Sequence, residues 1–415
     1  MKIAVIGAGF TGLTASLRLL QSGHSVTVFE KESAVGGLAG TYRKNNWNWP
    51  IEQHYHHWFT NDASAINLIK ELGLEPDFFS AQTRTSIYWE NRFYDLNSPL
   101  DVLSFSPLSI FSRIKFGAAT LFLKLLREND GLHLERYTAT DWLKRFYGPD
   151  GYRIVWEPLL KGKFGPFSEK VNMTWFWARV KKRTMRLGYL KGGYGRLLDQ
   201  LANRIHTKRG IIRLQTPFES RFQSSFDKII ATIPSPIFLN LFPKIPAAYK
   251  RQLTSIPHLH ALNLLIMSKE KILPDIYWLN INDRTFPFIA LIQQTNLTDA
   301  QNYGNSHLAY VGNYLPTNHP YLRMSKKELY RTYLPYLKKI NPQFDFDRNI
   351  ISLELFSAPF AQPVFSKNYS KIRPGFRTPV PNVYLANMDM VYPWDRGTNY
   401  AIEMGEKVAE LAVRG

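Results

Sequence analysis

Residues 2–12 read KIAVIGAGFTG, and this stretch decides the fold. After Lys2 the chain is apolar up to Ile6, a pattern typical of a short strand buried on both faces of a parallel sheet. The glycines of residues 7–12 follow at once as G-x-G-x-x-G, and leucines then repeat at helical spacing from about residue 11 to 22. The stretch therefore predicts a strand, a tight turn and a helix in immediate succession.

A second strand and an acidic residue extend this pattern. Residues 25–29 alternate two valines as a strand, and Glu30 ends it, roughly 20 residues after the glycines, as a dinucleotide-binding βαβ unit requires. Gly7 permits the tight turn, Gly9 lets backbone N–H groups approach a diphosphate, and Gly12 lets the helix pack close to the sheet. The helix N-terminus attracts the diphosphate, and Glu30 accepts hydrogen bonds from the ribose hydroxyls. A βαβ turn without nucleotide is the alternative.

Composition narrows the classes of function. The 415 residues suffice for two or three domains with a sizeable core. Because the chain has no cysteine, disulfides, thiolate metal sites, iron–sulfur clusters and cysteine nucleophiles are excluded. A formal charge of +19 attracts phosphates, anionic lipid or nucleic acid. No helix-turn-helix, zinc-finger spacing or basic block interleaved with aromatics is present, so we expect no nucleic-acid partner.

The N-terminal apolar run does not have the form of a signal peptide. Glycines interrupt it, Arg18 closes it and no small-residue cleavage pattern follows. No stretch approaches the roughly 20 uncharged apolar residues of a spanning helix. We expect a cytoplasmic protein with the option of peripheral association with the inner face of the membrane.

The residues after Glu30 indicate which dinucleotide the βαβ unit binds. Residues 31–40 read KESAVGGLAG, so a glycine pair at Gly36 and Gly37, followed by Leu38, can bring a second backbone segment to the diphosphate. This arrangement resembles the flavin-dependent amine oxidase, protoporphyrinogen oxidase and phytoene desaturase superfamily, in which the nucleotide motif continues into a Gly-Gly element. Lys31 or Glu32 stands where that family usually has an arginine. The resemblance implies FAD as the cofactor.

Later segments carry the same resemblance. Residues 188–197 (GYLKGGYGRL) are similar to the family's glycine-rich turn before a helix, and residues 226–234 to its strand returning to the nucleotide domain. Residues 383–389 and 396–401 resemble the closing motif, where a strand, an acidic residue and a helix start meet the flavin. A helix N-terminus at this place stabilises the anionic reduced flavin. Asp389, one position later than the family's usual aspartate, is the implied ribityl contact.

Residues 54–59, HYHHWF, are the most unusual local feature. Three histidines so close in sequence suggest a metal site, but a strand would direct His54 and His56 to one face and His57 to the other. No acidic cluster completes a site, so no metal is predicted. The family resemblance places the segment beside the isoalloxazine ring, where a neutral histidine hydrogen-bonds flavin or substrate. Packed or surface histidines are the alternative.

The middle of the chain mixes aromatic and basic residues. Residues 103–126 have the composition of an interfacial helix pair on an anionic bilayer, and equally of helices that cover a substrate cavity. Residues 156–164 and 175–179 carry aromatics and cations suited to a pocket for a partly apolar, anionic substrate. We expect a bulky small-molecule substrate of this kind, for example isoprenoid-like.

Three functions follow from these patterns. The first is an FAD-dependent oxidoreductase that removes a hydride from a carbon–carbon or carbon–nitrogen bond. The second is a non-redox flavoenzyme acting on a sugar nucleotide, because residues 57–62 also resemble the histidine segment of UDP-galactopyranose mutase, with Arg179 and Arg396 as the candidate phosphate-binding arginines. The third is a flavin-carrying scaffold or redox sensor on membranes.

The expected architecture is α/β, with a Rossmann-like FAD-binding domain of the glutathione-reductase type and an interposed α+β substrate domain. The nucleotide domain comprises residues 1–60, 188–240 and 375–415, and the substrate domain comprises residues 61–187 and 241–374. The candidate catalytic residues are His56, His57 and Arg396. The candidate cofactor-binding residues are Gly7, Gly9, Phe10, Thr11, Gly12, Glu30, Lys31, Gly36, Gly37, Leu38, Phe218, Asp389, Thr398, Asn399 and Tyr400.

Overall fold

A five-stranded parallel sheet unites distant parts of the chain. The computed structural model describes residues 1–414, and in it the sheet has the order β10-β2-β1-β11-β17. Its strands are β1 (Lys2–Ile6), β2 (Ser25–Phe29), β10 (Ile211–Arg213), β11 (Lys228–Ala231) and β17 (Val383–Leu385). The α/β fold class with a Rossmann-like parallel sheet is therefore confirmed. The domain boundaries stay a prediction.

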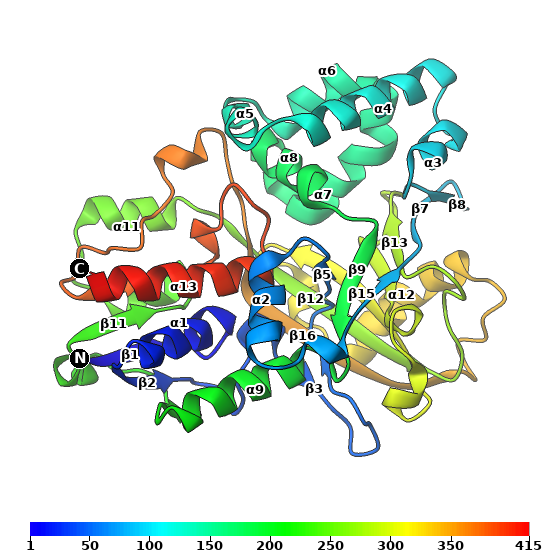
Figure 1. Ribbon diagram of the computed structural model, residues 1–415. Coiled ribbons are helices and arrows are strands. Elements are labelled where there is room, and N and C mark those ends of the chain that lie inside the picture. Colours follow the sequence, from blue (N-terminus) through cyan, green and yellow to red (C-terminus); the bar gives the residue numbers. More distant parts are fainter. Residues whose placement is uncertain (415) are drawn as a thin grey trace.

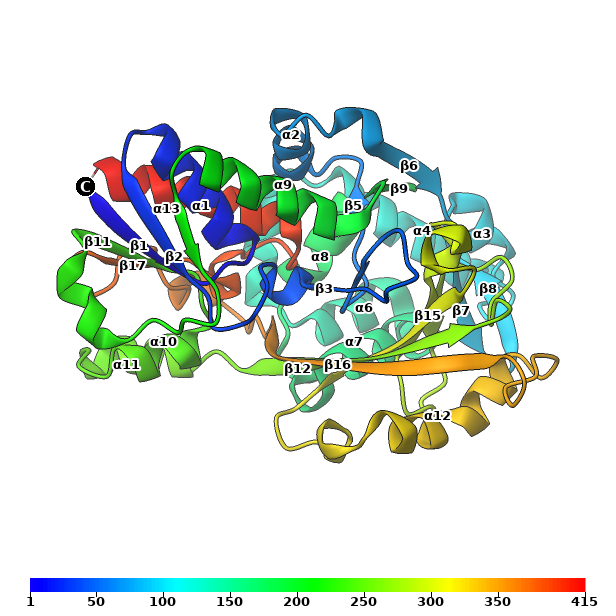
Figure 2. The same ribbon diagram turned by 90° about the horizontal axis from the view of Figure 1, so that it is seen from below.

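Helices cover both faces of this sheet (Figures 1 and 2). The helices are α1 (Phe10–Gln21), α9 (Gly193–Thr207) and α13 (Thr398–Arg414) on one face, and α10 (Ser235–Leu241) and α11 (Ala247–Thr254) on the other. Ile3 and Val5 of β1 pack into the core of the first face, whereas Ala4 and Ile6 pack into that of the second. Burial on both faces explains why β1 is apolar from Ile3 to Ile6.

Helices α1 and α13 pack closely at a glycine. A methyl group at Gly405 of α13 would lie 2.5 Å from the carbonyl oxygen of Thr11 in α1. This distance is shorter than any ordinary carbon contact, so the helix backbones approach here as only glycine allows. The contact holds the start of α1, and with it the glycine turn, against the C-terminal helix α13.

A seven-stranded mixed sheet forms the second half of the molecule. Its order is β16-β12-β15-β14-β13-β7-β8, and all neighbours are antiparallel except β13 and β7. The strands are β7 (Thr85–Trp89), β8 (Arg92–Asp95), β12 (His258–Ser268), β13 (Trp278–Ile281), β14 (Ala290–Gln293), β15 (His307–Leu315) and β16 (Ile350–Pro363). Helix α12 (Lys326–Ile340) packs on this sheet through Leu329, Tyr333 and Leu337.

The aromatic stretch of residues 85–95 forms a hairpin of two strands. Glu90 and Asn91 both have positive φ, 49° and 58°, and reverse the chain between β7 and β8. Two central residues with positive φ form the turn that matches the twist of a two-residue hairpin. The sequence signal was weak because this turn lacks the usual glycine.

Helices α3 to α8 form a separate layer at the end of the molecule remote from both termini (Figure 1). They are α3 (Pro99–Ser104), α4 (Ile110–Leu125), α5 (Glu128–Leu132), α6 (Ala139–Gly151), α7 (Glu157–Phe164) and α8 (Met173–Lys182). The helix pair predicted over 103–126 is α3 and α4, and α3 begins earlier because Ser98 and Asp101 form a capping box. Within residues 1–414, no helix combines the length and apolar character needed to cross a bilayer.

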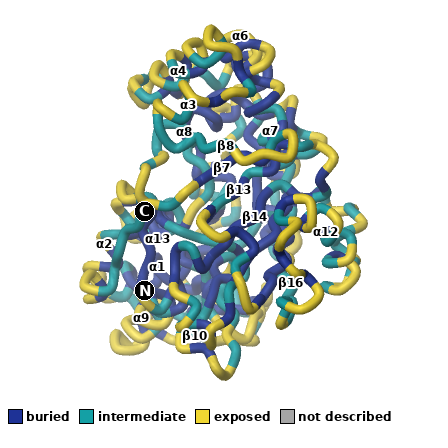
Figure 3. The backbone as a smooth tube through the Cα atoms, turned by 90° about the vertical axis from the view of Figure 1, so that its right-hand side faces the viewer, coloured by how far each residue is buried: buried dark blue, intermediate teal, exposed yellow. Residues whose placement is uncertain are grey.

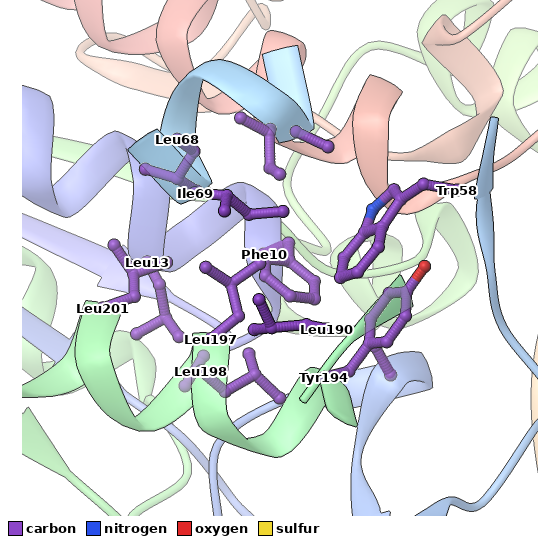
Figure 4. Packing of buried hydrophobic residues seen from close by; sticks show 14 of the residues in the cluster. Phe10, Leu13, Trp58, Leu68, Ile69, Leu190, Tyr194, Leu197, Leu198 and Leu201 are labelled. Atoms are coloured by element: carbon purple, nitrogen blue, oxygen red, sulfur yellow. The ribbon is translucent and has the colours of Figure 1, made fainter. Parts of the chain in front are cut away.

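Two small sheets and α2 (Ala63–Glu71) join the halves. The strands are β3 (Thr41–Tyr42) with β4 (Ile51–Glu52), and β5 (Trp58–Phe59), β9 (Arg186–Leu190) and β6 (Phe78–Gln82). Figure 4 shows the core at this junction, where Phe10 of α1, Trp58, and Tyr194 of α9 meet leucines of α2 and α9. Trp58 and Tyr194 stack with ring centroids 3.9 Å apart. This packing fixes the end of the histidine segment beside the nucleotide half.

Candidate functional site

The glycine turn lies between β1 and α1, as expected. Gly7 has φ +101°, a conformation that other residues rarely adopt. A methyl group at Gly12 would lie 2.0 Å from the carbonyl oxygen of Gly7, so the helix packs directly on the turn. The first hydrogen bond of α1 runs from Leu13 N to Gly9 O at 3.0 Å, which leaves the amides of Phe10 and Thr11 directed out of the helix end.

The carboxylate of Glu30 is held beside this turn. One oxygen accepts from the N–H of Ala8 at 2.7 Å and the other from the N–H of Glu32 at 3.0 Å. The side chain is 8% exposed, and the first turn of α1 carries no acidic residue. The position and fixed orientation of Glu30 suit a contact to ribose hydroxyls, because each carboxylate oxygen has a further lone pair.

The second glycine segment reaches the turn. Gly36 pairs with Gly9 in a parallel bridge, and its N–H donates to Ala8 O at 2.8 Å. Gly36 has φ +127°, and a methyl group at Gly37 would lie 3.5 Å from Gly9 Cα. The structure thus brings the two glycine elements together at one end of α1. The free amides and the glycine segment without side chains fit a diphosphate, and the fixed carboxylate fits the adjoining ribose.

The start of α13 is tied to the histidine segment and to α2. Thr398 Oγ1 accepts a hydrogen bond from the indole N–H of Trp58 at 2.9 Å. The side-chain oxygen of Asn399 accepts from the N–H of Ala65 at 3.0 Å. Both residues are buried, so the N-terminus of α13 is rigidly placed near the two glycine elements.

Other candidate cofactor residues lie apart from the turn. Lys31 is exposed and pairs with Glu32 at 3.1 Å, and Leu38 is half-buried. Phe218 packs edge-on against Phe29 at 5.2 Å. Tyr400 stacks on Trp394 and lines a hollow of 280 Å³ with Lys407. Their cofactor contacts stay predictions.

Asp389 is engaged within the protein. Its carboxylate is 1% exposed and accepts from Ser235 Oγ and from His258 Nε2, the latter at 2.7 Å. Its backbone carbonyl accepts from the Tyr369 hydroxyl at 2.8 Å. These bonds give Asp389 a structural role between the parallel sheet and β12, and its predicted ribityl contact is untested.

Only Trp58 and Phe59 of the histidine segment lie in a strand, β5. Residues 54–57 run without regular structure between β4 and β5, so the predicted alternation of side chains is wrong. His54 Nδ1 contacts the side-chain amide of Asn263 at 2.7 Å, His56 Nδ1 contacts the backbone oxygen of His54, and His57 Nδ1 contacts the Tyr277 hydroxyl at 3.2 Å. Each imidazole has its own partner, and residues 1–414 contain no cluster of three metal-ligating side chains.

Burial keeps these imidazoles neutral. It lowers the pKa of His56 to about 4 and that of His57 to about 3, and the charges of Arg396 and Arg183 respectively add to the effect. Both side chains nevertheless stay partly accessible to solvent. A neutral imidazole offers one donor and one acceptor, so His56 and His57 are suited to hydrogen bonding and not to carrying charge at neutral pH.

Beside the histidines lies a cluster of cations around one carboxylate. Asp395 accepts from Lys163 Nζ at 3.2 Å, from an Arg179 guanidinium nitrogen at 2.5 Å and from the indole N–H of Trp175 at 3.0 Å. Arg396 follows Asp395 directly, and its Nε donates to the Gln362 side-chain oxygen at 2.9 Å. The cluster therefore holds more positive than negative charge.

Aromatic rings enclose these cations. Tyr314 has Lys163 at 5.3 Å and Arg396 at 4.9 Å from its ring centre, and Trp175 has Lys163 and Arg179 at 5.3 and 5.2 Å. Burial lowers the pKa of Lys163 to about 7, while the adjacent cations hold the pKa of Asp395 well below its usual range despite burial. Burial and the Arg179 charge lower the pKa of Arg396 to about 10. Aromatic faces with surplus buried cations suit an anionic ligand that is otherwise apolar.

Sequence reasoning missed two acidic residues at the site. Asp395 organises the cations, and its only local signal is that it precedes Arg396. Glu52 is fully buried and accepts from the Tyr189 hydroxyl at 2.8 Å and the Tyr194 N–H at 2.8 Å. Burial raises the pKa of Glu52 to about 7. No sequence pattern marks a buried carboxyl whose partners lie more than 130 residues away.

One family model matches nearly the whole chain. The model of the flavin containing amine oxidoreductases matches residues 10–413. The chain belongs to this family. The expected fold, the FAD cofactor and the oxidoreductase class are thereby confirmed at the level of the family.

Similar proteins support the same family. This chain is 25% identical over 158 residues to a 15-cis-phytoene desaturase of Synechococcus elongatus, covering 35% of this chain and 33% of the relative. The chain thus spans about a third of that relative's length.

Two solved structures share its fold. A putative protoporphyrinogen oxidase from Exiguobacterium sp. is 16% identical with a TM-score of 0.76, over 100% of this chain and 99% of the other. A reduced UDP-galactopyranose mutase is 12% identical with a TM-score of 0.74, over 100% and 95%.

Proposed function

We propose that this oxidoreductase removes a hydride from a carbon–carbon or carbon–nitrogen bond of a bulky, partly apolar substrate that carries an anionic group. The observation that carries the proposal is the aromatic cage around Lys163, Arg179 and Arg396. Lys163 and Arg179 share the single carboxylate of Asp395, and the Arg396 guanidinium lies against two neutral groups, the Gln362 side-chain oxygen and the Tyr314 ring. A buried surplus of positive charge is costly unless an anion balances it. The substrate's anionic group supplies that balance, and the aromatic rings contact its apolar part.

Residues at the nucleotide end hold the cofactor. The amides at the start of α1, the Gly36–Gly37 segment and Glu30 would bind the diphosphate and ribose, and the start of α13 would face the flavin. Bound FAD supplies the hydride acceptor. The substrate would thus lose one hydride, which this acceptor takes up, and one proton, which is released to solvent.

The histidines orient and do not act as bases. A group with a pKa of about 3 or 4 is a weak proton acceptor at neutral pH, because an efficient base has a pKa near the working pH. His56 and His57 instead offer hydrogen bonds to flavin or substrate. Lys163, with a pKa lowered to about 7, is the cluster group that titrates near neutrality.

Anaerobic mixing tests the reaction. The purified holoprotein is incubated with prenyl diphosphates, carotenoid precursors, amino acids and amines while the absorbance of oxidised flavin is followed. We expect bleaching with an anionic, partly apolar compound, and at least a tenfold rise in its half-saturating concentration in Arg396→Lys. Arg221→Lys is the matched control, because the exposed Arg221 pairs with Glu219 and lies over the Phe222 ring, outside the cation cluster. Flavin that photoreduction bleaches but no compound reduces would contradict the proposal.

A second candidate is a non-redox reaction on a sugar nucleotide. It is favoured by one observation, that the charge of Arg179 acts on the neighbouring Arg396 guanidinium, so a diphosphate could bind to both guanidinium groups. Turnover of a sugar nucleotide only after dithionite reduction would favour this candidate over hydride removal. Turnover without reduction, or none, would exclude it.

A further inference from the structure

Helices α3 and α4 expose an apolar surface away from the site. Twelve of the eighteen large hydrophobic side chains exposed within residues 1–414 fall between residues 93 and 146. Single exposed apolar residues are normal on any protein, whereas a concentration of them marks an interaction surface. We define the docking face by Leu100 (75% exposed), Phe111 (82%), Ile114 (57%), Leu121 (59%), Phe122 (51%) and Leu125 (70%). Figure 3 shows the exposed backbone of α3, α4 and α6 at this end of the molecule.

Helix α4 is apolar on two opposite sides. Phe116, Ala119 and Leu123 are buried against the rest of the helical layer. At 100° per residue, the exposed apolar residues 110–125 occupy a separate arc of about 120° on the other side. A helix that only covers a core needs a single apolar stripe. The second stripe on α4 therefore has another apolar partner.

Cations border the docking face. On the same helical projection Lys115 lies at one edge of the exposed arc and Arg113 lies at the other. Residues 99–127 contain four cations and one carboxylate, Asp101, whose side chain caps α3. An apolar face with a cation at each edge is the pattern of a helix that lies in an anionic membrane interface.

We propose that this face docks the protein on an anionic lipid bilayer. Charge favours an anionic bilayer over a second copy of the chain as the partner. A second copy carries the same cations and a formal charge of +19, so the two copies would repel each other. An anionic bilayer instead meets the apolar stripe with acyl chains and the bordering cations with headgroups. The proposal does not depend on which substrate the site takes.

The docking face is connected to the site through α8. Lys124 Nζ donates to the backbone oxygens of Lys181 and Arg183 at 3.4 and 2.7 Å, at the end of the helix that carries Arg179. Docking of α4 thus places α8, with its substrate-binding cation, close to the membrane surface.

Vesicle flotation tests the surface. The holoprotein is floated with vesicles of phosphatidylcholine alone and with 30% phosphatidylglycerol. We expect binding to the anionic vesicles and at least a tenfold lower partition coefficient for Phe111→Ser/Leu125→Ser. The control Ile211→Ser/Ile351→Ser removes two exposed apolar residues elsewhere and should change binding less than twofold. Bound flavin and circular dichroism verify that each variant is folded.

A label reports which face is in contact. Because the chain has no cysteine, Phe111→Cys and Ile351→Cys each carry a single environment-sensitive dye. Anionic vesicles should shift the emission of the dye at 111 to the blue and leave that at 351 unchanged. Equal binding of wild type and Phe111→Ser/Leu125→Ser, or equal shifts at both positions, would show adsorption by net charge alone and overturn the proposal. A concentration-dependent dimer that Phe111→Ser/Leu125→Ser abolishes would assign the face to a second copy and also overturn it.

Discussion

Gly12→Ala tests whether close packing at the glycine turn builds the FAD site. The added methyl group would lie 2.0 Å from Gly7 O and 2.9 Å from Thr232 Oγ1, whereas ordinary contacts begin at 3.4 Å. Either α1 or the turn must therefore move by about 1 Å, because a backbone oxygen cannot rotate away. Overpacking of this kind costs about 1–3 kcal/mol of unfolding free energy. The same shift moves the helix amides that would bind the diphosphate.

Gly117→Ala is the matched control. Gly117 lies within α4, and a methyl group there meets nothing within 4 Å. Alanine should stabilise this helix by about 1 kcal/mol, since glycine has the lower helix propensity. The two variants carry the same chemical change and should differ by about 2–4 kcal/mol.

Two measurements check the Gly12→Ala prediction. Chemical denaturation gives the stability difference, and flavin fluorescence titration of apoprotein gives the FAD affinity. We expect FAD binding at least about tenfold weaker in Gly12→Ala, because hydrogen bonds to a charged group contribute about 1.5–3 kcal/mol each. Added FAD should stabilise Gly117→Ala as it does the wild type, but Gly12→Ala only at higher concentration. Wild-type affinity and stability in Gly12→Ala would refute the reasoning.

Three further outcomes are expected. Glu30→Gln should weaken FAD binding about tenfold or more in the same titration, because the amide loses the charge that favours ribose hydroxyls. It should also lower stability by about 1–3 kcal/mol, because the amide oxygen can accept only one of the two backbone N–H bonds that the carboxylate accepts. Unchanged affinity would exclude the ribose contact. Asp395→Asn should lower stability by about 3–5 kcal/mol in denaturant, since Lys163 and Arg179 lose their shared carboxylate; a loss under 1 kcal/mol would contradict this. Glu52→Gln should flatten the pH dependence of stability. Burial raises the pKa of Glu52 to about 7, so the folded state binds a proton that the unfolded state has lost, and wild-type stability falls as pH rises from about 4.5 to 7. An identical fall in the variant would show that another group is responsible.

The sequence by itself determined the nucleotide half. β1, α1 and β2 were predictable because apolar periodicity, glycine spacing and the acidic residue at position 30 are local signals. The strands β11 and β17 and the helix α13 could also be located, since each is a short apolar or amphipathic run with clear ends. The hairpin of β7 and β8 could not be located from the sequence, because Glu90 and Asn91 adopt positive φ at its turn and no glycine marks it.

Only the tertiary structure decided the substrate side. Lys163 and Asp395 are 232 residues apart in the chain, and Glu52 and Tyr194 are 142 residues apart. No local sequence pattern can therefore predict either contact. The histidines were visible as a motif, but their neutral state follows from burial and from arginines that other elements supply. Hydrophobic periodicity acts over one helix or strand, whereas the balance of buried charge depends on every segment that packs around the site.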